Sequence, residues 1–354
     1  MEPDRTGPGA LRDELAAMAP GTPLRDGLER ILSGRTGALV VLGENEVIDQ
    51  VSTGGLALDV PFTATALREL AKMDGAIVLG PGKGRITRAG GHLMPDRSIE
   101  TFETGTRHRT ADRVARQSGL PVVSVSASMS TISLYLAHER HLVERSEQIL
   151  SRADQALQTL ERYRGRLREV AVRLSSQEVQ DVATVKDFAL VAQRMEMVRR
   201  LENELNGYVM ELGTDGRLLT LQLSELSADF ERLPELLEMD YRPADADFGL
   251  HHLHGLSTAQ LVDPLVVART VGFGPGVALD DRVVSRGFRQ VAQIGRLPPA
   301  LGARLIEHFG SLQALFGASI AELQEVDGVG AGRARVIRDG LLRLAEAAYS
   351  DRME

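Results

Sequence analysis

The sequence predicts an α/β N-terminal domain, with a mixed central sheet covered by helices, then an all-α helical spacer and a compact all-helical C-terminal domain. Short apolar runs alternate with helical spacing over residues 1–140. A heptad seam follows within residues 141–290. From residue 291 onward, glycine turns separate short helical patterns. We therefore expect three domains with these boundaries, 1–140, 141–290 and 291–354.

Periodicity predicts the individual elements of the N-terminal domain. Apolar side chains recur at helical spacing in three segments, which are 11–18, 24–32 and 65–72. Continuous apolar or alternating β-branched runs predict strands at 38–43, 76–80, 120–128 and 131–136. Strands that alternate with helices favour a parallel or mixed sheet buried between helical layers.

Length and composition exclude several classes of protein. With 354 residues, the chain is too long for one ordinary core. A net charge of −8 argues against a generally basic nucleic-acid coat, although a local basic patch is compatible with it. The absence of cysteine excludes disulfides, thiolate zinc sites and a cysteine nucleophile. No apolar run is long enough to span a bilayer, so we expect a cytoplasmic protein without a membrane partner.

The spacer carries two heptad seams, one over residues 149–174 and one over residues 191–212. A break is expected between them, near Ser175-Ser176. Such seams fit either an intermolecular coiled coil or an antiparallel helical pair within one chain. A break followed by a second seam favours the intrachain pair.

Two glycine-rich segments resemble known glycine motifs, but their residues do not match those motifs. Gly80-Pro81-Gly82-Lys83-Gly84 is not a P-loop, because a glycine follows the lysine where Ser or Thr is needed. Gly328-Val329-Gly330 is not a dinucleotide-binding motif, because the preceding residues have a helical pattern. We interpret the first segment as a basic turn.

Two short segments carry the candidate chemistry. Asp74-Gly75-Ala76 places a carboxylate just before a predicted strand, and Gly105 precedes Thr106-Arg107-His108-Arg109-Thr110. In an extended segment Arg107 and Arg109 would share one side, with His108 on the other. A plain turn and a solvated charge run are the alternatives. An acid on one loop and clustered cations on another suit a metal-bound polyphosphate.

The pair of motifs resembles the diadenylate cyclase family. The resemblance implies that Asp74 lies by the ribose 3′-hydroxyl and binds Mg²⁺ or Mn²⁺, and that Arg107, His108 and Arg109 bind the triphosphate. It implies ATP contacts or proximity for a further set, which comprises Gly75, Ala76, Leu93, Thr106 and Thr110. Ser124, Ser126 and Ser128 follow one face of a predicted strand that family members use near the nucleotide, although an ordinary polar face is an equal alternative.

The C-terminal glycines resemble a helix-hairpin-helix DNA-binding motif. The residues that carry it, as candidate DNA contacts, are Gly328, Val329, Gly330, Gly332 and Arg333. A degenerate partner hairpin is expected upstream, from Arg296 to Gly310. From Arg296 on, seven Lys and Arg face eight Asp and Glu, so the charge supports only weak, sequence-independent binding. A protein-binding version of the same fold is the alternative.

End to end, the chain resembles the members of the diadenylate cyclase family that scan DNA integrity. This implies condensation of two ATP into cyclic di-AMP with release of two pyrophosphates. It also implies a homo-octamer with face-to-face cyclase domains, binding of branched DNA such as Holliday junctions, a DNA-damage checkpoint role and a nucleoid-associated location. A non-catalytic ATP-sensing DNA-repair adaptor is the main alternative. A nucleotidyltransferase acting on protein or RNA is a third, but only Asp74 is well placed among the acids such enzymes pair.

Overall fold

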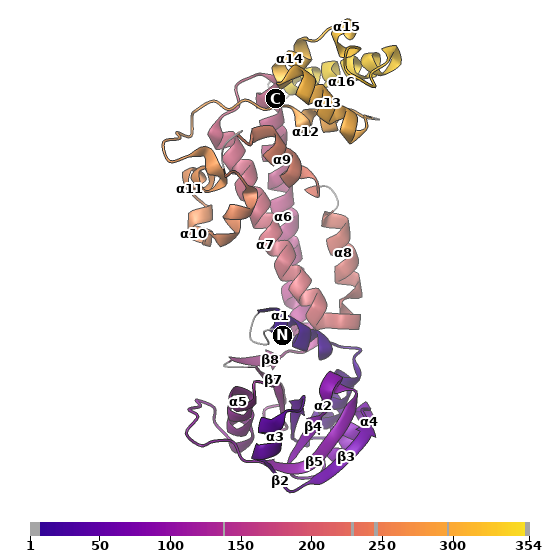
Figure 1. The fold of residues 1–354 in the computed structure, drawn as a ribbon, viewed down its shortest axis with the longest axis vertical. Helices are drawn as coiled ribbons and strands as arrows, with labels where there is room; N and C mark the ends of the chain where they lie inside the picture. Colours follow the sequence, from indigo (N-terminus) through magenta and orange to yellow (C-terminus); the bar gives the residue numbers. More distant parts are fainter. Residues whose placement is uncertain (1–7, 137–138, 228–229, 244–246, 296, 351–354) are drawn as a thin grey trace. The chain divides into compact units, whose positions relative to one another are not determined.

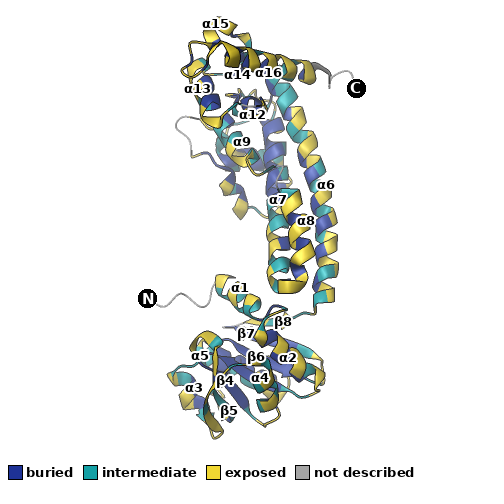
Figure 2. Cartoon of the chain, turned by 90° about the vertical axis from the view of Figure 1, so that its right-hand side faces the viewer, coloured by how far each residue is buried: buried dark blue, intermediate teal, exposed yellow. Residues whose placement is uncertain are grey.

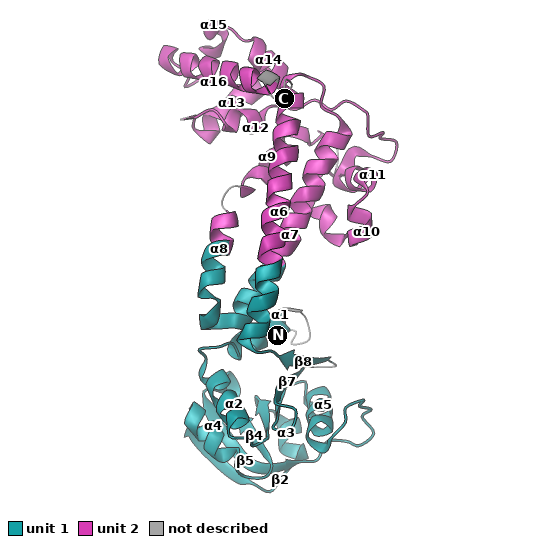
Figure 3. Cartoon of the chain, turned by 180° about the vertical axis from the view of Figure 1, so that it is seen from behind, with its two compact units in different colours: residues 1–155, 204–222 teal, residues 156–203, 223–354 magenta. Residues whose placement is uncertain are grey.

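The computed structural model describes residues 8–136, 139–227, 230–243, 247–295 and 297–350. The chain divides into two compact units (Figure 3). The first contains Met1–Gln155 and Glu204–Gln222, and the second contains Ala156–Asn203 and Leu223–Glu354. The predicted fold class is confirmed, since the first unit holds a mixed sheet with helices and the second is helical. The long spacer helices contribute to both units, a division that the three predicted segments do not contain.

An eight-stranded mixed sheet forms the centre of the first unit, in the order β2-β5-β4-β1-β6-β7-β8, with β3 pairing β5. Among the described strands, β1 and β4 pair in parallel and the other pairs are antiparallel. The strands are β1 Ala38–Leu42, β2 Ser52–Thr53, β3 Leu56–Pro61, β4 Ala76–Leu79, β5 Arg85–Leu93, β6 Val122–Ser126, β7 Thr131–Leu136 and β8 Glu139–Val143. The sheet therefore continues past the predicted boundary at residue 140.

Helices cover both faces of this sheet (Figure 1). One layer consists of α1 (Pro8–Ala17), α2 (Pro23–Ser33) and α4 (Ala64–Leu70), and the other of α3 (Glu46–Val51) and α5 (Thr106–Ser118). Val40 of β1 packs in the first layer, whereas its neighbours Leu39 and Val41 pack in the second. Burial on both faces explains why β1 reads as a continuous apolar run rather than an alternating one.

The spacer is an antiparallel helical pair within one chain, as the second seam indicated. It consists of α6 (Ser146–Val179) and α7 (Val185–Leu212), which lie side by side in Figures 1 and 2. Arg164 and Glu202 pair across it at 3.1 Å, and Arg173 and Asp187 at 3.7 Å nearer the turn. The break expected near Ser175-Ser176 lies a few residues later, at 180–184, because α6 continues through both serines to Val179.

Shorter helices complete the second unit. Around the helical pair lie α8 (Arg217–Ser227), which crosses the unit boundary, and α9 (Leu233–Tyr241), α10 (Thr258–Leu261), α11 (Pro264–Ala268) and α12 (Phe288–Ala292). The last residues form α13 (Pro299–Phe309), α14 (Leu312–Gly317), α15 (Ile320–Leu323) and α16 (Ala331–Ser350). These four helices share one apolar core with α12, in which Leu305, Leu323 and Ile337 are fully buried. No helix among the described residues is both long and apolar enough to cross a membrane.

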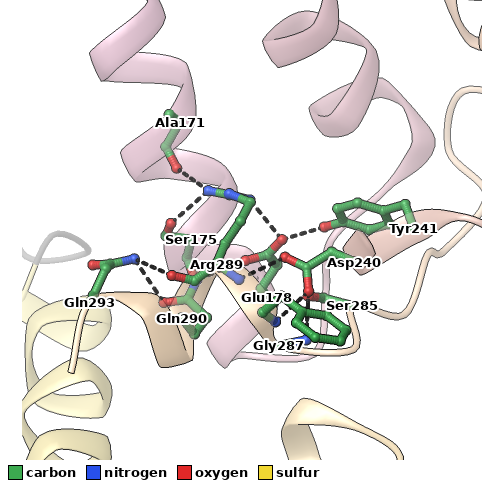
Figure 4. Close-up of polar contacts among 11 residues, drawn as sticks. Ala171, Ser175, Glu178, Asp240, Tyr241, Ser285, Gly287, Arg289, Gln290 and Gln293 are labelled. Atoms are coloured by element: carbon green, nitrogen blue, oxygen red, sulfur yellow. Dashed lines mark hydrogen bonds and ion pairs between the residues drawn. The ribbon is translucent and has the colours of Figure 1, made fainter. Parts of the chain in front are cut away.

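A buried polar cluster ties the end of α6 to α9 and α12 (Figure 4). The carboxylate of Glu178 accepts hydrogen bonds from Arg289, Gln290 and the hydroxyl of Tyr241. Asp240 of α9 accepts the backbone N–H groups of residues 287–289 and so caps the start of α12. Burial and the Glu178 carboxylate raise the pKa of Asp240 to about 7.

Candidate active site

The strand register brings the candidate residues to one end of the sheet. Leu39 of β1 pairs with Ala76 of β4, so continuing the parallel register places Gly37 opposite Asp74. On the other side of β1, Ala38 pairs with Val125, which places Gly37 opposite Ser126. The end of β6 thus lies two strands from Asp74, on the same edge of the sheet.

Asp74 is exposed on the turn between α4 and β4 and forms no ion pair or side-chain hydrogen bond with any described residue. Gly75 beside it has φ +114°. A Cβ at Gly75 would lie 2.6 Å from the carbonyl carbon of Gly90 on β5. Glycine is therefore required here by the close approach of two backbones, which holds the carboxylate of Asp74 at the edge.

The Arg-His-Arg segment is helical, so the extended geometry predicted for it is wrong. Residues 106–109 form the first turn of α5, which begins when the N–H of Arg109 bonds the carbonyl of Gly105 at 3.1 Å. Gly105 has φ +87°, which lets the chain turn into the helix. In a helix, residues two apart lie about 200° around the axis. Arg107 and Arg109 consequently point in different directions, and both are exposed.

The guanidinium of Arg107 lies against Gly37, the residue that precedes β1. A Cβ built on Gly37 would come within 2.1 Å of Nη1 of Arg107, so this guanidinium rests directly against the Gly37 backbone. Gly37 is the residue opposite Asp74. The cation from α5 and the carboxylate from the α4–β4 turn thus lie at the starts of the neighbouring strands β1 and β4.

His108 is directed inward from α5 and is 6% exposed. Its Nδ1 lies 2.8 Å from the hydroxyl of Tyr135 on β7, and its Nε2 is buried without a hydrogen-bond partner among the described residues. Burial lowers the pKa of His108, and the positive charges of Arg140 and Arg107 lower it further against the opposing effect of Glu103. The imidazole is therefore neutral at pH 7.

Two more buried polar atoms near α5 have no partner among the described residues, the Oγ of Ser124 and the Oγ1 of Thr131. Ser124 of β6 pairs with Ser133 of β7. Thr131 lies two residues before Ser133, so Thr131, Ser133 and Tyr135 share one face of β7. This is the face that α5 covers. Because buried polar groups are nearly always paired, three such atoms on one face indicate the place of a polar ligand or water.

The remaining predicted nucleotide contacts differ in accessibility. Thr106 is exposed, and Thr110 uses its hydroxyl to bond the carbonyl of Thr106 at 2.9 Å. Ala76 and Leu93 are 2% and 8% exposed and belong to the core beneath α3 and α5. Ser126 is also buried, within 3.3 Å of the hydroxyl of Ser128 in the following turn.

A cavity of about 1050 Å³ lies at the opposite end of the sheet, where β1 and β4 end. Several of its polar side chains already have partners. Lys83 pairs with Glu14 at 2.5 Å, and Asn45 accepts the N–H of Ile48 while donating to the carbonyl of Ser118. The turn around Lys83 is thus basic but lies away from Asp74, and the unpartnered buried atoms favour the Asp74 end.

The donor set fits a divalent cation held jointly with a nucleotide. Among the described residues no group of three His, Asp or Glu side chains gathers to hold a metal. Mg²⁺ usually takes one or two carboxylates and completes its shell with phosphate oxygens and water. Asp74 is exposed and unpaired among the described residues, which matches that requirement.

The C-terminal glycines form the predicted turn between α15 and α16. Gly328 has φ +88°, and the N–H of Ala334 bonds the carbonyl of Gly330, which leaves the first amides of α16 open. Gly330, Gly332 and Arg333 are exposed, whereas Val329 is buried in the core and offers only its backbone. Arg296, the predicted start of the upstream hairpin, lies outside the described residues.

Sequence reasoning did not identify three residues near His108, namely Glu103, Tyr135 and Arg140. Arg140 of β8 bonds Ser133 at 3.2 Å and pairs with Glu103 at 3.1 Å. Tyr135 looked like one more apolar strand residue, since periodicity reports burial and not partners. The available signal was a tyrosine hydroxyl on the strand face that also carries Thr131 and Ser133.

Comparison with known proteins shows the family to which the chain belongs. The family model described as DisA bacterial checkpoint controller nucleotide-binding (DAC) matches residues 25–140, and that of the DisA bacterial checkpoint controller linker region matches residues 143–279. The DNA integrity scanning protein DisA of Frankia alni is 54% identical over 98% of both chains. The chain belongs to the DisA family and is a diadenylate cyclase.

Further DisA proteins are similarly close. That of Kineococcus radiotolerans is 55% identical over 99% of both chains. Among solved structures, DacA from Staphylococcus aureus has 23% identity and a TM-score of 0.29, covering 38% of this chain and 88% of that one. The match to DisA proteins extends over nearly the whole chain, including the C-terminal helices that follow the two family models.

Proposed function

We propose that this DisA protein condenses two ATP into cyclic di-AMP and two pyrophosphates at the end of the sheet marked by Asp74 and α5. One observation carries the proposal. His108, Ser124 and Thr131 each bury a polar atom without a partner among the described residues, on the face of the sheet that α5 covers, and a bound nucleotide would satisfy these atoms.

The triphosphate would bind at the N-terminus of α5. The N–H groups of residues 106–108 have no intrahelical partner, because the first helical bond begins at Arg109. Together with the helix dipole they favour an anion. Arg107 and Arg109 add two exposed guanidiniums, which bind phosphate oxygens bidentately. Thr106 and Thr110 lie beside them, and the backbone of Gly75 and Ala76 with Leu93 would border the nucleoside.

Asp74 would act on the ribose and on the metal. Its carboxylate would hold Mg²⁺ or Mn²⁺ together with phosphate oxygens, and it would orient the 3′-hydroxyl. When bound, the ion supplies neutralising charge for the pyrophosphate and a lower pKa for the hydroxyl. The chain's own contribution is position and fixed charge, which account for much of phosphoryl-transfer catalysis.

The reaction needs two protomers. Each 3′-hydroxyl must attack the α-phosphorus of the other nucleotide in line, and one domain holds one ATP. Three large apolar side chains are exposed around this end of the sheet, Phe102 at 94%, Met94 at 60% and Met129 at 52%. They fit a face that a second cyclase domain covers. We propose a homo-octamer in which cyclase domains meet face to face.

The hairpin turn at Gly328, Val329, Gly330, Gly332 and Arg333 would bind DNA. The open amides of α16 and the exposed Arg333 suit the phosphate backbone, which carries no sequence information. Branched DNA such as a Holliday junction is the proposed ligand. The protein would then act in the cytoplasm, associated with the nucleoid, as a checkpoint that reports DNA damage through cyclic di-AMP.

Incubation of the full-length protein with ATP and Mg²⁺ or Mn²⁺, followed by mass spectrometry, tests the reaction. We expect cyclic di-AMP with two pyrophosphates for each product molecule. Bound but unconverted ATP would favour the ATP-sensing adaptor instead. Transfer of AMP to an added protein or RNA would indicate a different nucleotidyltransferase.

A further inference from the structure

The environment of His108 points to a residue that acts on it. Tyr135 of β7 is 1% exposed, and its hydroxyl lies 2.8 Å from Nδ1 of His108. The two rings are 6.2 Å apart and tilted by 54°. The other ring nitrogen, Nε2, is buried and has no partner among the described residues. The tyrosine therefore controls one nitrogen, while the other remains available to a ligand.

We propose that Tyr135 is a positioning residue whose hydroxyl donates a hydrogen bond to Nδ1 of His108. Nε2 then carries the hydrogen of the neutral imidazole and donates a hydrogen bond to a phosphate oxygen. The inference rests on the proposed function, because it requires a nucleotide at this site. A neutral imidazole has one donor and one acceptor nitrogen, and the bond at one nitrogen decides the role of the other.

The surrounding charges favour this direction of the hydrogen bond. Burial and the Glu103 carboxylate raise the pKa of Tyr135 well above its usual value in spite of Arg140, so the phenol keeps its hydrogen. The other anion affecting the phenol is Asp112, which pairs with Arg116 at 2.8 Å. Glu103 also lies beside the phenol, but Arg140 approaches both of its oxygens, at 3.1 and 3.4 Å. The imidazole, kept neutral by burial and by Arg140 and Arg107, is the acceptor without another donor.

A donor at Nε2 has a clear use at a triphosphate. Nucleotide phosphates offer acceptors and no donors at neutral pH, so an unprotonated Nε2 facing them would be repelled. In water a neutral imidazole exchanges between its two protonation forms. The hydrogen bond from Tyr135 would fix the form protonated at Nε2 before the nucleotide binds. This lowers the free-energy cost of forming the hydrogen bond from Nε2 to the phosphate.

Steady-state kinetics of a double-mutant cycle test the inference. Tyr135→Phe keeps the buried ring and removes only the hydroxyl. We expect kcat/KM for ATP to fall about 10-fold, which corresponds to about 1.4 kcal/mol. Tyr208→Phe is the matched control, since its hydroxyl also bonds a side chain, Glu204, at 2.7 Å but lies on α7. We expect wild-type kinetics for that variant.

His108→Gln is the second single variant of the cycle. Its amide places an N–H donor near the position of Nε2, and this donor does not depend on a tautomer. Removal of the Tyr135 hydroxyl should have less than a twofold effect in this background. Equal losses from Tyr135→Phe with and without His108 would show that the hydroxyl merely supports the fold and would overturn the inference, as would wild-type kinetics of the single variant.

A spectroscopic measurement covers the case in which Tyr135→Phe does not fold and is independent of cyclase activity. In full-length protein labelled with ¹⁵N-histidine, the His108 signals are assigned by their loss in His108→Gln. At pH 8 we expect an unprotonated Nδ1 and a protonated Nε2. A protonated Nδ1 would overturn the inference, whereas absence of cyclic di-AMP in the wild type with the expected tautomer would contradict the proposed function alone.

Discussion

Arg289 and Glu178 form a buried ion pair, with Nη1 2.8 Å from the carboxylate and side chains that are 4% and 0% exposed. The pair joins the first helix of the C-terminal helical core to the last turn of α6. Arg289 also donates to the carbonyl of Ala171 and the hydroxyl of Ser175. Any movement of α12 is therefore coupled to α6, the helix that continues directly from the cyclase sheet.

Removal of one member of this pair leaves the other charged and buried. We expect Arg289→Met to lower the free energy of unfolding of the second unit by about 3 kcal/mol. The double change with Glu178→Met should recover much of that loss. Urea denaturation measures both. Arg242→Met is the control, because its ion pair with Glu238 is exposed and should contribute less than about 1 kcal/mol.

Asp240 gives the second unit a distinctive dependence on pH. Its pKa is raised from 3.8 to about 7, so between these values the folded state holds a proton that the unfolded state has lost. Stability from this group is complete below about pH 4 and is lost as the pH rises through 7. The free energy of unfolding of the wild type, minus that of Asp240→Asn, should fall over this range. A difference that rises with pH would contradict the assignment.

Asp74→Asn should abolish cyclic di-AMP synthesis, with a loss of at least about 100-fold, because the amide neither binds the cation nor orients the hydroxyl as the carboxylate does. The side chain is exposed and unpaired among the described residues, so the thermal unfolding midpoint should stay unchanged. Asp59→Asn, another exposed acid of this unit, should keep full activity. Normal turnover by folded Asp74→Asn would remove this residue from the mechanism.

The backbone at Gly75 should tolerate no side chain. Gly75→Ala combines φ +114° with a Cβ 2.6 Å from backbone atoms of Gly90, so we expect a loss of about 2 kcal/mol or more in unfolding free energy. Gly82→Ala measures the cost of the positive φ alone, because Gly82 has φ +73° and no atom lies within 4 Å of the added Cβ. Its cost should be about 1 kcal/mol. Equal costs at both positions would show that the contact with β5 is unimportant.

We expect the double variant Arg333→Ala and Arg335→Ala to bind branched DNA more weakly, by the same factor for every DNA sequence. Both side chains are exposed at the start of α16, and each lost phosphate contact should reduce the slope of log affinity against log salt by about 1. Arg343→Ala, an exposed change farther along the same helix, serves as the control. Unchanged DNA affinity in the double variant would place the DNA contacts elsewhere.

Much of the fold could be predicted because its core elements have clear periods. The continuous apolar run at β1 indicates a strand that is buried on both faces. The two heptad seams indicate helices that are each buried along one stripe. The break between the seams lies a few residues beyond Ser175-Ser176, because α6 runs through both serines to Val179. Both serines form tertiary hydrogen bonds within the second unit, Ser175 with Arg289 and Ser176 with the carbonyl of Ala348.

The site was only partly predictable for a similar reason. The motif residues were identified, but the Thr-Arg-His-Arg-Thr run has no apolar pattern, so its helical state was hidden. The signal lay just beyond it, in the buried Ala111, Val114 and Ala115 at spacings of three and four. Tyr135 could not be assigned to His108 from sequence, because their contact depends on which helix covers β7.

The central claim is that chemistry requires two cyclase faces, and Phe102→Glu tests it most directly. The ring is 94% exposed, so the substitution should spare the fold while placing a charge in the proposed interface. Light scattering first establishes whether the folded variant has lost its face-to-face association. Mass spectrometry of its reaction with ATP is then the decisive measurement. We expect protomers that cannot associate to bind ATP and form no cyclic di-AMP, and cyclic di-AMP from such protomers would contradict the account.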